Sequence, residues 1–316
     1  MVDFDLTEEQ RLLQKTARDF AQREMRPVAL EYDKKGEVPW DIIKKAHALG
    51  LDTAFIPEPY GGGGIDSTLT HVIVMEELNW GCAGMATGLI GAGLAYLPII
   101  HMGTEDQKKR FLTRFTGPEA RLGALCLTEP DAGSDVANIS TTAVKKGDEW
   151  VLNGVKRFIT NGGIADLHVV FATTDKSLGY FGIRAFVVEH DTPGLTMGKV
   201  EDKMGVRASH TAEVLLDDCR IPLDNMLGSD EGTAFYGAMK TLESSRPLVA
   251  AGAVGIARAA YEYALDYARK RKAFGSPIAK KQAIAFMLAD MKAKIDAARL
   301  LVWRAAWMLD QGMPMN

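Results

Sequence analysis

The hydrophobic pattern of the chain changes twice, and these changes limit the folds that it can adopt. From Thr7 to about residue 117, apolar residues recur at helical spacing. From 118 to about 228 they fall in short runs, rich in β-branched and aromatic residues and separated by turn residues. Helical spacing then returns and continues to residue 316. This order predicts an α+β fold in three domains: a helical domain at 1–117, an antiparallel β domain at 118–228 and an incomplete helical bundle at 229–316.

Helix starts in the first domain carry their own signals. Thr7 with Gln10 and Thr104 with Gln107 form two capping boxes, and Pro27 interrupts the first helical pattern. The weakly polar stretch 81–100 is rich in Gly and Ala and contains Cys, Thr, Tyr and Pro, so we expect a buried helix there and not a membrane span. Further helices are predicted at 39–49, with Gly50 as its stop, and at 67–78.

The middle domain is predicted as a meander of short strands. The dipeptide Asn153–Gly154 tolerates the positive φ of a tight hairpin turn, so we expect one strand to end there and another to begin. Lys146-Gly147-Asp148 gives a second turn signal. Strands are predicted at 122–128, 141–145, 150–152, 156–160, 167–173 and 183–189.

Composition excludes several classes of function. A net charge of −4 gives no sequence-wide basic field, so nucleic acid is not expected as a partner. The three cysteines Cys82, Cys126 and Cys219 lack CxxC spacing, so we expect neither a disulfide framework nor a metal site, and a reducing compartment fits. The amino terminus MVDFDLTEEQ has no secretory or transit pattern, which favours the cytoplasm.

Common nucleotide motifs are missing, but one loop has suitable chemistry. Gly91-Ala92-Gly93 lacks the third glycine of a dinucleotide fingerprint, and Gly61–Gly64 has no GK[ST] continuation. The run CLTEPDAGSDV at 126–136 leaves a predicted strand and is dense in small residues and hydroxyls. Its backbone N–H groups around 131–134 would suit a pyrophosphate, although an ordinary surface turn has the same composition.

A second candidate segment follows the helix predicted at 261–269. The four residues from Arg269 to Lys272 are basic, and Phe274 and Gly275 come next. These cations either complement the dipole of their own helix or bind a phosphate. Phe274 either stacks on a planar ring or fills the core.

Five ordered motifs together resemble the acyl-CoA dehydrogenases, with the medium- and short-chain branches most similar. The resemblance implies the same three domains, FAD as cofactor, a homotetramer or homodimer, and electron-transferring flavoprotein as electron acceptor. The motifs are PEPYGGGGID at 57–66, LTEPDAGSDV at 127–136, KRFITNGG at 156–163, DKMGVRAS at 202–209 and RKRKAFGSPI at 269–278.

The resemblance also implies residue roles around FAD. The loop 125–134 would line the flavin, the strand at 158–160 would pack on its ring, and residues after 270 would reach the FAD of a neighbouring subunit. Phe158 stands where relatives often have Trp, which keeps the stacking and loses an indole donor. The implied cofactor residues are Leu125, Leu127, Thr128, Gly133, Ser134, Phe158, Ile159, Thr160, Arg271, Lys272, Phe274 and Gln282.

For the acyl-CoA substrate, the resemblance implies contacts from Ser134, Glu243, Ser245 and Arg246. Some branches hold their catalytic base at the position of Ser245, and a serine does not abstract an α-proton unaided. The medium- and short-chain branches keep a glutamate farther along, so we expect the base beyond Asn316; Glu243 is the only nearby carboxylate. Ile90 lies where some relatives place a polar residue, which predicts an apolar pocket floor.

The implied reaction is α,β-dehydrogenation of an acyl-CoA thioester. A carboxylate removes the α-proton and the β-hydride passes to flavin N5. Two alternatives stay open from the sequence: a catalytically silent protein that binds flavin or acyl-CoA without the base, and a helical scaffold that binds no ligand.

Overall fold

The structure is a computed structural model that describes residues 5–228 and 234–314, with the side chains of 90–92 also outside the description. The chain divides into two compact units. The first, called here the helical unit, comprises Met1–Ala29, Asp66–Ala86 and Ser244–Asn316. The second, the sheet unit, comprises Leu30–Ile65 and Thr87–Glu243.

Helices α1 and α4 of the helical unit begin where the sequence predicts them, whereas the helix predicted at 261–269 is the end of the much longer α7. The Thr7 capping box is present in both directions, with Gln10 N donating to Thr7 Oγ1 at 3.1 Å and Thr7 N donating to Gln10 Oε1 at 3.0 Å. Near the predicted interruption at Pro27, the helical chain passes through a short π-helical turn. The elements are α1 (Glu8–Phe20), the π turn (Ala21–Met25), α4 (Thr68–Gly81), α8 (Gln282–Asp310) and the part of α7 (Ala234–Lys270) from Ser244 onward.

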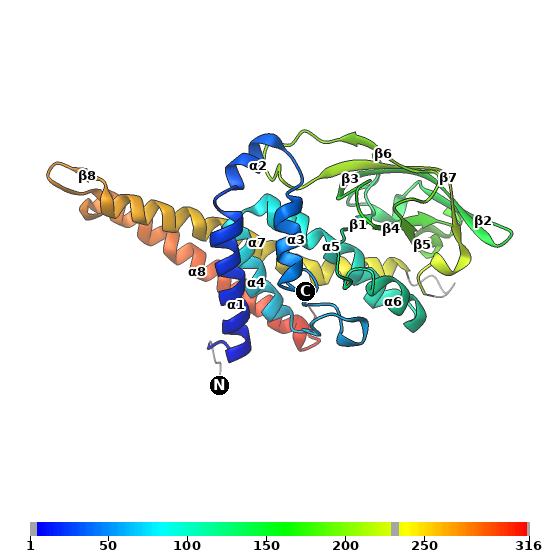
Figure 1. The fold of residues 1–316 in the computed structure, drawn as a ribbon, viewed down its shortest axis with the longest axis horizontal. Helices are drawn as coiled ribbons and strands as arrows, with labels where there is room; N and C mark the ends of the chain where they lie inside the picture. The colour runs from blue at the N-terminus through cyan, green and yellow to red at the C-terminus, as the bar shows by residue number, and fades with distance from the viewer. Residues whose placement is uncertain (1–4, 229–233, 315–316) are drawn as a thin grey trace. The chain divides into compact units, whose positions relative to one another are not determined.

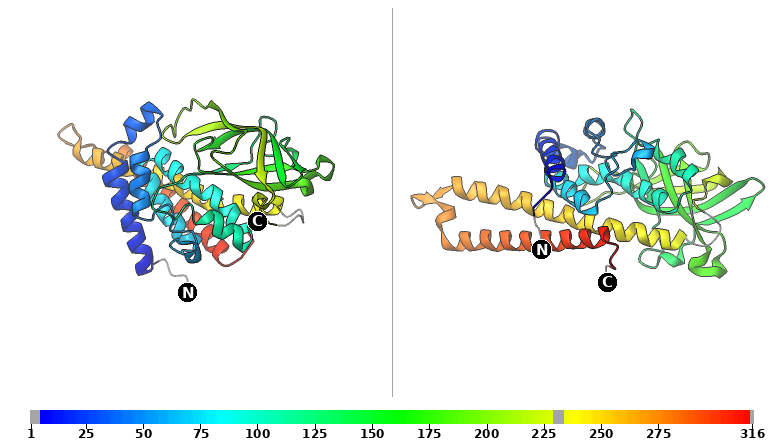
Figure 2. Two further views of the ribbon diagram at one scale, coloured as in Figure 1. Left: turned by 45° about the vertical axis from the view of Figure 1, so that its right-hand side comes forward. Right: turned by 90° about the horizontal axis from the view of Figure 1, so that it is seen from below.

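Close packing of α4 on α7 depends on two glycines of α7. A Cβ atom on Gly255 would lie 2.3 Å from the Glu76 carbonyl oxygen, and a Cβ on Gly252 would lie 3.1 Å from the Asn79 side chain. Helix α8 runs antiparallel to α7, and the short strands β8 (Lys272–Ala273) and β9 (Ser276–Pro277) connect them (Figure 2). The two helices therefore form a helical hairpin within the predicted helical region.

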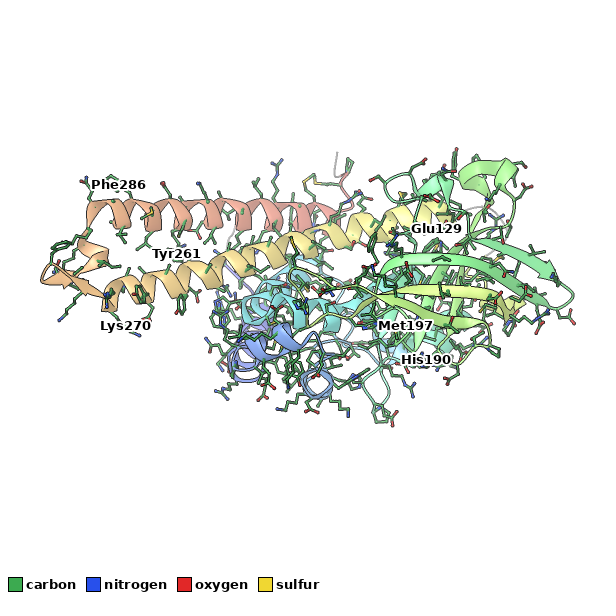
Figure 3. The ribbon with its side chains drawn as sticks, turned by 90° about the horizontal axis from the view of Figure 1, so that it is seen from above. Glu129, His190, Met197, Tyr261, Lys270 and Phe286 are labelled. Atoms are coloured by element: carbon green, nitrogen blue, oxygen red, sulfur yellow. The ribbon has the colours of Figure 1, made fainter. Side chains whose placement is uncertain are left out.

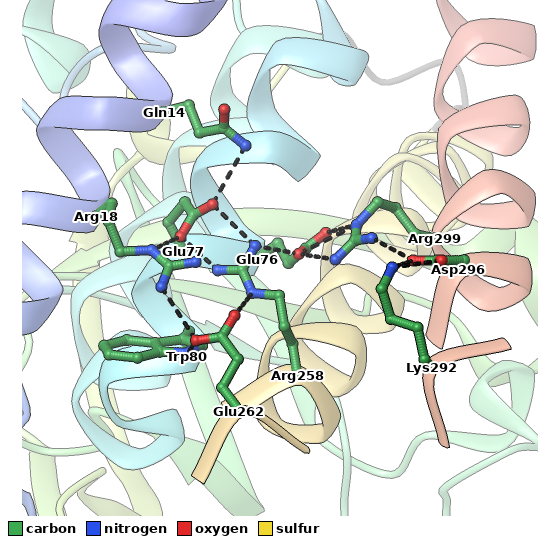
Figure 4. Close-up of polar contacts among 10 residues, drawn as sticks. All are labelled: Gln14, Arg18, Glu76, Glu77, Trp80, Arg258, Glu262, Lys292, Asp296 and Arg299. Atoms are coloured by element: carbon green, nitrogen blue, oxygen red, sulfur yellow. Dashed lines mark hydrogen bonds and ion pairs between the residues drawn. The ribbon is translucent and has the colours of Figure 1, made fainter. Parts of the chain in front are cut away.

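Charged side chains connect four helices of this unit. Glu76 and Glu77 on α4 are buried, and Arg258 of α7 pairs with both, at 2.6 Å from Glu76 (Figure 4). Arg299 of α8 donates to Glu76 at 2.8 Å, and Arg18 of α1 pairs with Glu77. Buried carboxylates require such partners, since an unpaired charge in the interior is costly.

The helices of the sheet unit include α5, the predicted buried helix. An 18-residue window of α5 is 67% buried inside the protein, as in the core helix of a globular protein. By length and composition alone, α5 and α7 are each long and apolar enough to cross a membrane, and the α7 window is 39% buried. The helices are α2 (Ala29–Lys35), α3 (Trp40–Ala48), α5 (Ala83–Met102) and α6 (Glu105–Leu112), with the first turns of α7.

The sheet has seven strands in the order β1-β4-β2-β3-β7-β6, with β5 paired to β4 (Figure 1). The predicted antiparallel sheet contains one parallel strand pair, because β1 pairs with β4 in parallel, Gly123 opposite Leu167. The other described pairings are antiparallel, apart from one parallel contact between β2 and β4. The strands are β1 (Gly123–Cys126), β2 (Thr142–Lys146), β3 (Glu149–Thr160), β4 (Leu167–Thr173), β5 (Ile183–Glu189), β6 (Leu195–Val200) and β7 (Thr211–Pro222).

The hairpin predicted at Asn153–Gly154 is also wrong. The two expected strands form one long strand, β3, and the register against β7 shifts between Leu152 and Gly154. Gly154 has φ +154°, and a Cβ there would lie 2.4 Å from Thr141 Oγ1. The register shift places the extra residue on β7, so Gly154 serves the close approach of two chain segments, and not a turn. The tight turn lies at Gly147–Asp148, between the paired residues Lys146 and Glu149.

The core of the sheet unit surrounds β4. Every residue of β4 is buried, which is typical of a strand covered on both faces. Phe111 of α6 belongs to the same buried cluster as Phe171 and Val187. No strand occurs among residues 113–122, between α6 and β1, and α7 begins at Ala234. The predicted domain limits at 117 and 228 therefore fall between elements, and they stay predictions.

Candidate functional site

The loop after β1 folds back on itself before it reaches β2. Glu129 and Ala132 form an isolated bridge, with Glu129 N donating to the Ala132 carbonyl at 2.9 Å. Thr128 is half-buried, whereas Gly133 and Ser134 are exposed. The loop thus presents the small residues and the hydroxyl that the sequence singled out.

A buried ion pair holds this loop on β3. The Glu129 carboxylate lies 2.7 Å from the Lys156 ammonium, and Lys156 also donates to the Leu127 carbonyl at 3.2 Å. The remaining lone pairs of Glu129 accept from Ser140 and Thr141, at 2.5 Å and 3.0 Å from the two main-chain nitrogens. Neither Glu129 nor Lys156 was predicted as a site residue. Their only sequence signal is that each lies inside one of the five ordered motifs.

The pair determines the ionisation of Glu129. Burial opposes the charge, but the Lys156 ammonium and the hydrogen bonds from Ser140 and Thr141 outweigh burial and lower the pKa of Glu129 to about 2. Glu129 is therefore ionised at neutral pH and acts as an anchor.

The anchored loop lies against the predicted ring-binding strand. Arg157 N donates to the Thr128 carbonyl at 2.8 Å, which places Thr128 next to Phe158 in the structure although 30 positions separate them in the chain. The Phe158 side chain is 58% exposed, with the Arg157 guanidinium 5.1 Å from its ring centre. Ile159 is buried and Thr160 half-buried.

Phe158 also has an unusual backbone. Its φ is +59°, and the β3–β7 register shifts between Lys156 and Ile159. A bulky residue with positive φ is strained and persists only where the surrounding structure holds it. An exposed apolar ring beside the half-buried Thr128 fits a planar ligand with polar edges.

The structure brings most of the predicted cofactor residues together in the sheet unit. Leu125 and Leu127 lie on β1 and just after it, with Leu125 half-buried and Leu127 buried. The residues that share this region of the sheet unit are Leu125, Leu127, Thr128, Gly133, Ser134, Phe158, Ile159 and Thr160.

The other predicted cofactor residues, Arg271, Lys272, Phe274 and Gln282, belong to the helical unit, around the β8–β9 hairpin. Lys270 and Phe286 lie at the end of α7 and near the start of α8, on either side of this hairpin (Figure 3). Among the described residues, Arg271 and Lys272 make no ion pair, and both lie beyond the last residue of α7. They are exposed cations available to an anion.

Phe274 does not fill the core. It is 95% exposed, with Lys281 Nζ 5.2 Å from its ring centre. Phe274 and Gly275 have φ values of +52° and +77°, as in a two-residue type I′ turn, where Asn-Gly is the preferred pair. Phe274 therefore holds its ring exposed to solvent on a backbone conformation that is unfavourable for a bulky residue.

The predicted substrate residues lie on α7. Glu243 is half-buried at the edge of the sheet unit, whereas Ser245, which is buried, and Arg246, which is exposed, belong to the helical unit. Two helical steps rotate Glu243 away from Ser245 by roughly 200°. The side chain of Ile90, the predicted pocket floor, lies outside the described residues. No group of three or more His, Cys, Asp or Glu side chains suited to a metal ion occurs in the part of the chain that the structure describes.

Three family models match consecutive parts of the chain. They describe the acyl-CoA dehydrogenase N-terminal domain at residues 7–119, the middle domain at 124–219 and the C-terminal domain at 232–316. Together the matches extend over nearly the whole chain.

Individual relatives agree with these matches. The chain is 45% identical over 311 residues to the human short-chain specific acyl-CoA dehydrogenase, mitochondrial, a match that covers 98% of this chain and 75% of the relative. It is similar to butyryl-CoA dehydrogenase from Megasphaera elsdenii, with a TM-score of 0.94, 45% identity and coverage of 99% of this chain and 82% of the other. A chain from a structure of the electron transferring flavoprotein of Acidaminococcus fermentans gives the same TM-score and coverage at 44% identity.

Proposed function

Because this chain belongs to the acyl-CoA dehydrogenase family, which makes it an oxidoreductase with FAD as cofactor, we propose that it desaturates a short acyl-CoA thioester between the α and β carbons. The relatives that act on short acyl groups support the chain length. One proton and one hydride leave the substrate, and FAD supplies the hydride acceptor when bound.

One observation carries the proposal: both phenylalanines assigned to FAD are exposed and conformationally strained. Phe158 and Phe274 are two of the five described non-glycine residues with positive φ. Exposed apolar rings gain nothing from core burial, and each such backbone conformation costs of order 1–3 kcal/mol. A stacking role in ligand binding accounts for both features, because it needs an accessible ring held in a fixed direction.

The residues of the loop and of β3 have separate tasks in this proposal. Phe158 and the half-buried Thr128 bind the ring, and Thr128 directs its hydroxyl at the polar edge. Ser134, exposed on the same loop, serves the cofactor and the CoA moiety. The Glu129–Lys156 pair keeps loop and strand together, so that the ring site exists before the ligand arrives.

The α-proton passes to a carboxylate in this reaction. Glu243, half-buried on α7, is the weaker candidate, because the resemblance implies a glutamate farther along and the helix turns Glu243 away from Ser245. Its assignment as base, and the substrate contacts of Ser245 and Arg246, stay predictions.

The exposed hairpin at β8–β9 supports an assembly of several copies. Arg271, Lys272 and Phe274 are exposed, as is Gln282 at the start of α8. We infer that they bind the FAD of a second copy in a homodimer or homotetramer, with the cations on the pyrophosphate and the ring beside the nucleotide. Electron-transferring flavoprotein is the proposed electron acceptor and the cytoplasm the proposed location.

The test is an anaerobic titration of the FAD-loaded chain with butyryl-CoA and octanoyl-CoA, followed by turnover with a dye acceptor. Loss of the flavin absorbance band on adding butyryl-CoA, with turnover, would support dehydrogenation and would mean that the base is among these residues. A flavin spectrum that shifts but does not bleach would favour the silent binding protein, and a chain that takes up no FAD would contradict the proposal. Phe158→Ala should weaken FAD binding, whereas Phe181→Ala, another exposed ring of the sheet unit, should not.

A further inference from the structure

A polar cavity of about 230 Å³ lies in the sheet unit, formed by the DKMGVRAS motif that the proposed function leaves without a role. Its walls are residues 200–203, Arg207, residues 209–211, and Lys35 with Gly36 at the end of α2. The volume is several times the roughly 30 Å³ that one water molecule occupies in the liquid. The cavity can therefore hold a small ligand together with a few water molecules.

Arg207 hydrogen-bonds this motif to α2, with one guanidinium nitrogen, Nη2, taking no part. Its main-chain N donates to Asp33 Oδ1 at 3.1 Å and its Nε to the Asp33 carbonyl at 2.9 Å. Nη1 donates to Asp202 at 2.6 Å and to the Lys203 carbonyl at 2.7 Å. Nη2 makes no hydrogen bond with any described residue, and a Cβ on Gly36, in the cavity wall, would lie 3.7 Å from it.

Lys203 lacks an acidic partner. Its ammonium donates to the Ser209 carbonyl and to Thr211 Oγ1, both neutral, and no carboxylate of the described residues lies within ion-pair distance. Burial lowers the pKa of Lys203, and the Arg207 guanidinium lowers it further. The charges of Asp33 and Glu201 act in the opposite direction and raise its pKa, but burial and Arg207 outweigh them.

The carboxylates in the wall are already paired with other cations. Asp202 holds Arg207 Nη1 at 2.6 Å. Glu201 lies 3.5 Å from Lys199 and 3.7 Å from Arg157. Neither carboxylate lies within ion-pair distance of the Lys203 ammonium, although the charge of Glu201 raises the pKa of Lys203.

Ser209, in the cavity wall, has a buried hydroxyl without a hydrogen-bond partner among the described residues. The residue is 1% exposed, and its hydroxyl makes no hydrogen bond with the residues that the structure describes. A buried hydroxyl without a partner costs roughly 1–3 kcal/mol, so a ligand that accepts its proton is favoured.

We propose that this cavity binds a small tetrahedral oxyanion, inorganic phosphate or a phosphate monoester, held by Lys203, Arg207 Nη2 and the Ser209 hydroxyl. Two cations and a hydroxyl donor are the groups that phosphate binding uses elsewhere in proteins. The site needs neither FAD nor acyl-CoA and stands independently of the proposed function.

The test is isothermal titration of the FAD-loaded full chain with inorganic phosphate at constant ionic strength. Saturable binding is expected, weakened about tenfold by Ser209→Ala, the loss of one hydrogen bond to a charged group. Lys203→Gln should weaken it further. Lys145→Gln, which changes an exposed lysine of β2 outside the cavity wall, should leave it unchanged.

Glycerol 2-phosphate in a second titration separates the two ligand sources. Competition with phosphate in the wild type, lost in Ser209→Ala, would assign a monoester; absence of competition would assign the free ion. No saturable binding of either probe in the millimolar range would overturn the proposal. Phosphate binding that is unchanged in Ser209→Ala would also overturn the proposal. Because Ser209→Ala removes only one hydroxyl, it can be measured even if Lys203→Gln fails to fold.

Discussion

The Glu129 carboxylate and the Lys156 ammonium lie 2.7 Å apart with both side chains buried, 1% and 0% exposed. Glu129 belongs to the loop after β1 and Lys156 to β3, so this contact joins the two segments that form the predicted ring site.

Removing one partner of the pair should destabilise the protein strongly. Lys156→Met leaves a buried carboxylate without its cation, at an expected cost of about 3–5 kcal/mol. Urea unfolding followed by circular dichroism measures it. The double variant Glu129→Gln with Lys156→Met should recover part of the loss; a Lys156→Met single variant as stable as the wild type would show that the pair does not hold the loop.

Glu129 should make stability depend on acid pH. Its folded pKa of about 2 lies below the ordinary value of 4.5, so the ionised carboxylate stabilises the fold fully above about pH 5. That contribution, about 3 kcal/mol for a depression of this size, is lost as pH falls from 4.5 towards 2. Urea titrations across this range should show a smaller loss in Glu129→Gln than in the wild type; equal losses would contradict the assignment.

Phe274→Asn should separate stability from cofactor binding. Asparagine tolerates the positive φ of the turn, and the wild-type ring is 95% exposed and packs on little. We expect the FAD-free protein to gain about 1 kcal/mol while FAD affinity falls about tenfold. Thermal unfolding and flavin fluorescence titration measure the two effects. Phe286→Asn, an exposed ring on α8 without positive φ, should give no gain in stability.

Glu76→Gln should loosen the helical unit. Glu76 neutralises Arg258 at 2.6 Å and Arg299 at 2.8 Å, and its own side chain is 6% exposed. The expected loss is about 3–5 kcal/mol, because two partly buried arginines lose a shared counter-ion. Asp296→Asn removes a more exposed partner of Arg299 and should cost less than about 1 kcal/mol. Denaturant midpoints that fall equally for both variants would contradict a special role of Glu76.

Helix starts were predictable because their causes are local. The capping boxes at Thr7 and Thr104 need only a hydroxyl and a glutamine three residues later, and both are confirmed. Gly50 follows α3 with φ +69°, as expected of a helix stop. The Asn153–Gly154 turn failed because a glycine also serves the close approach of a distant segment, here Thr141, which local sequence does not show.

The candidate site was predictable only in part. The motifs around Thr128 and Phe158 were visible, but the pair that joins them was not, because 27 positions separate Glu129 from Lys156. Exposure of Phe274, against the alternative of a core residue, was likewise decided by the fold.

By itself, the sequence determined which segments form helices and strands and which family motifs occur, because apolar spacing, capping residues and glycines act over a few neighbouring residues. Tertiary structure alone decided the parallel pairing of β1 with β4, the bulge in β3 and the partners of each buried charge. These depend on contacts between distant segments, where burial makes an unpaired polar group costly and so selects a partner that local sequence does not specify.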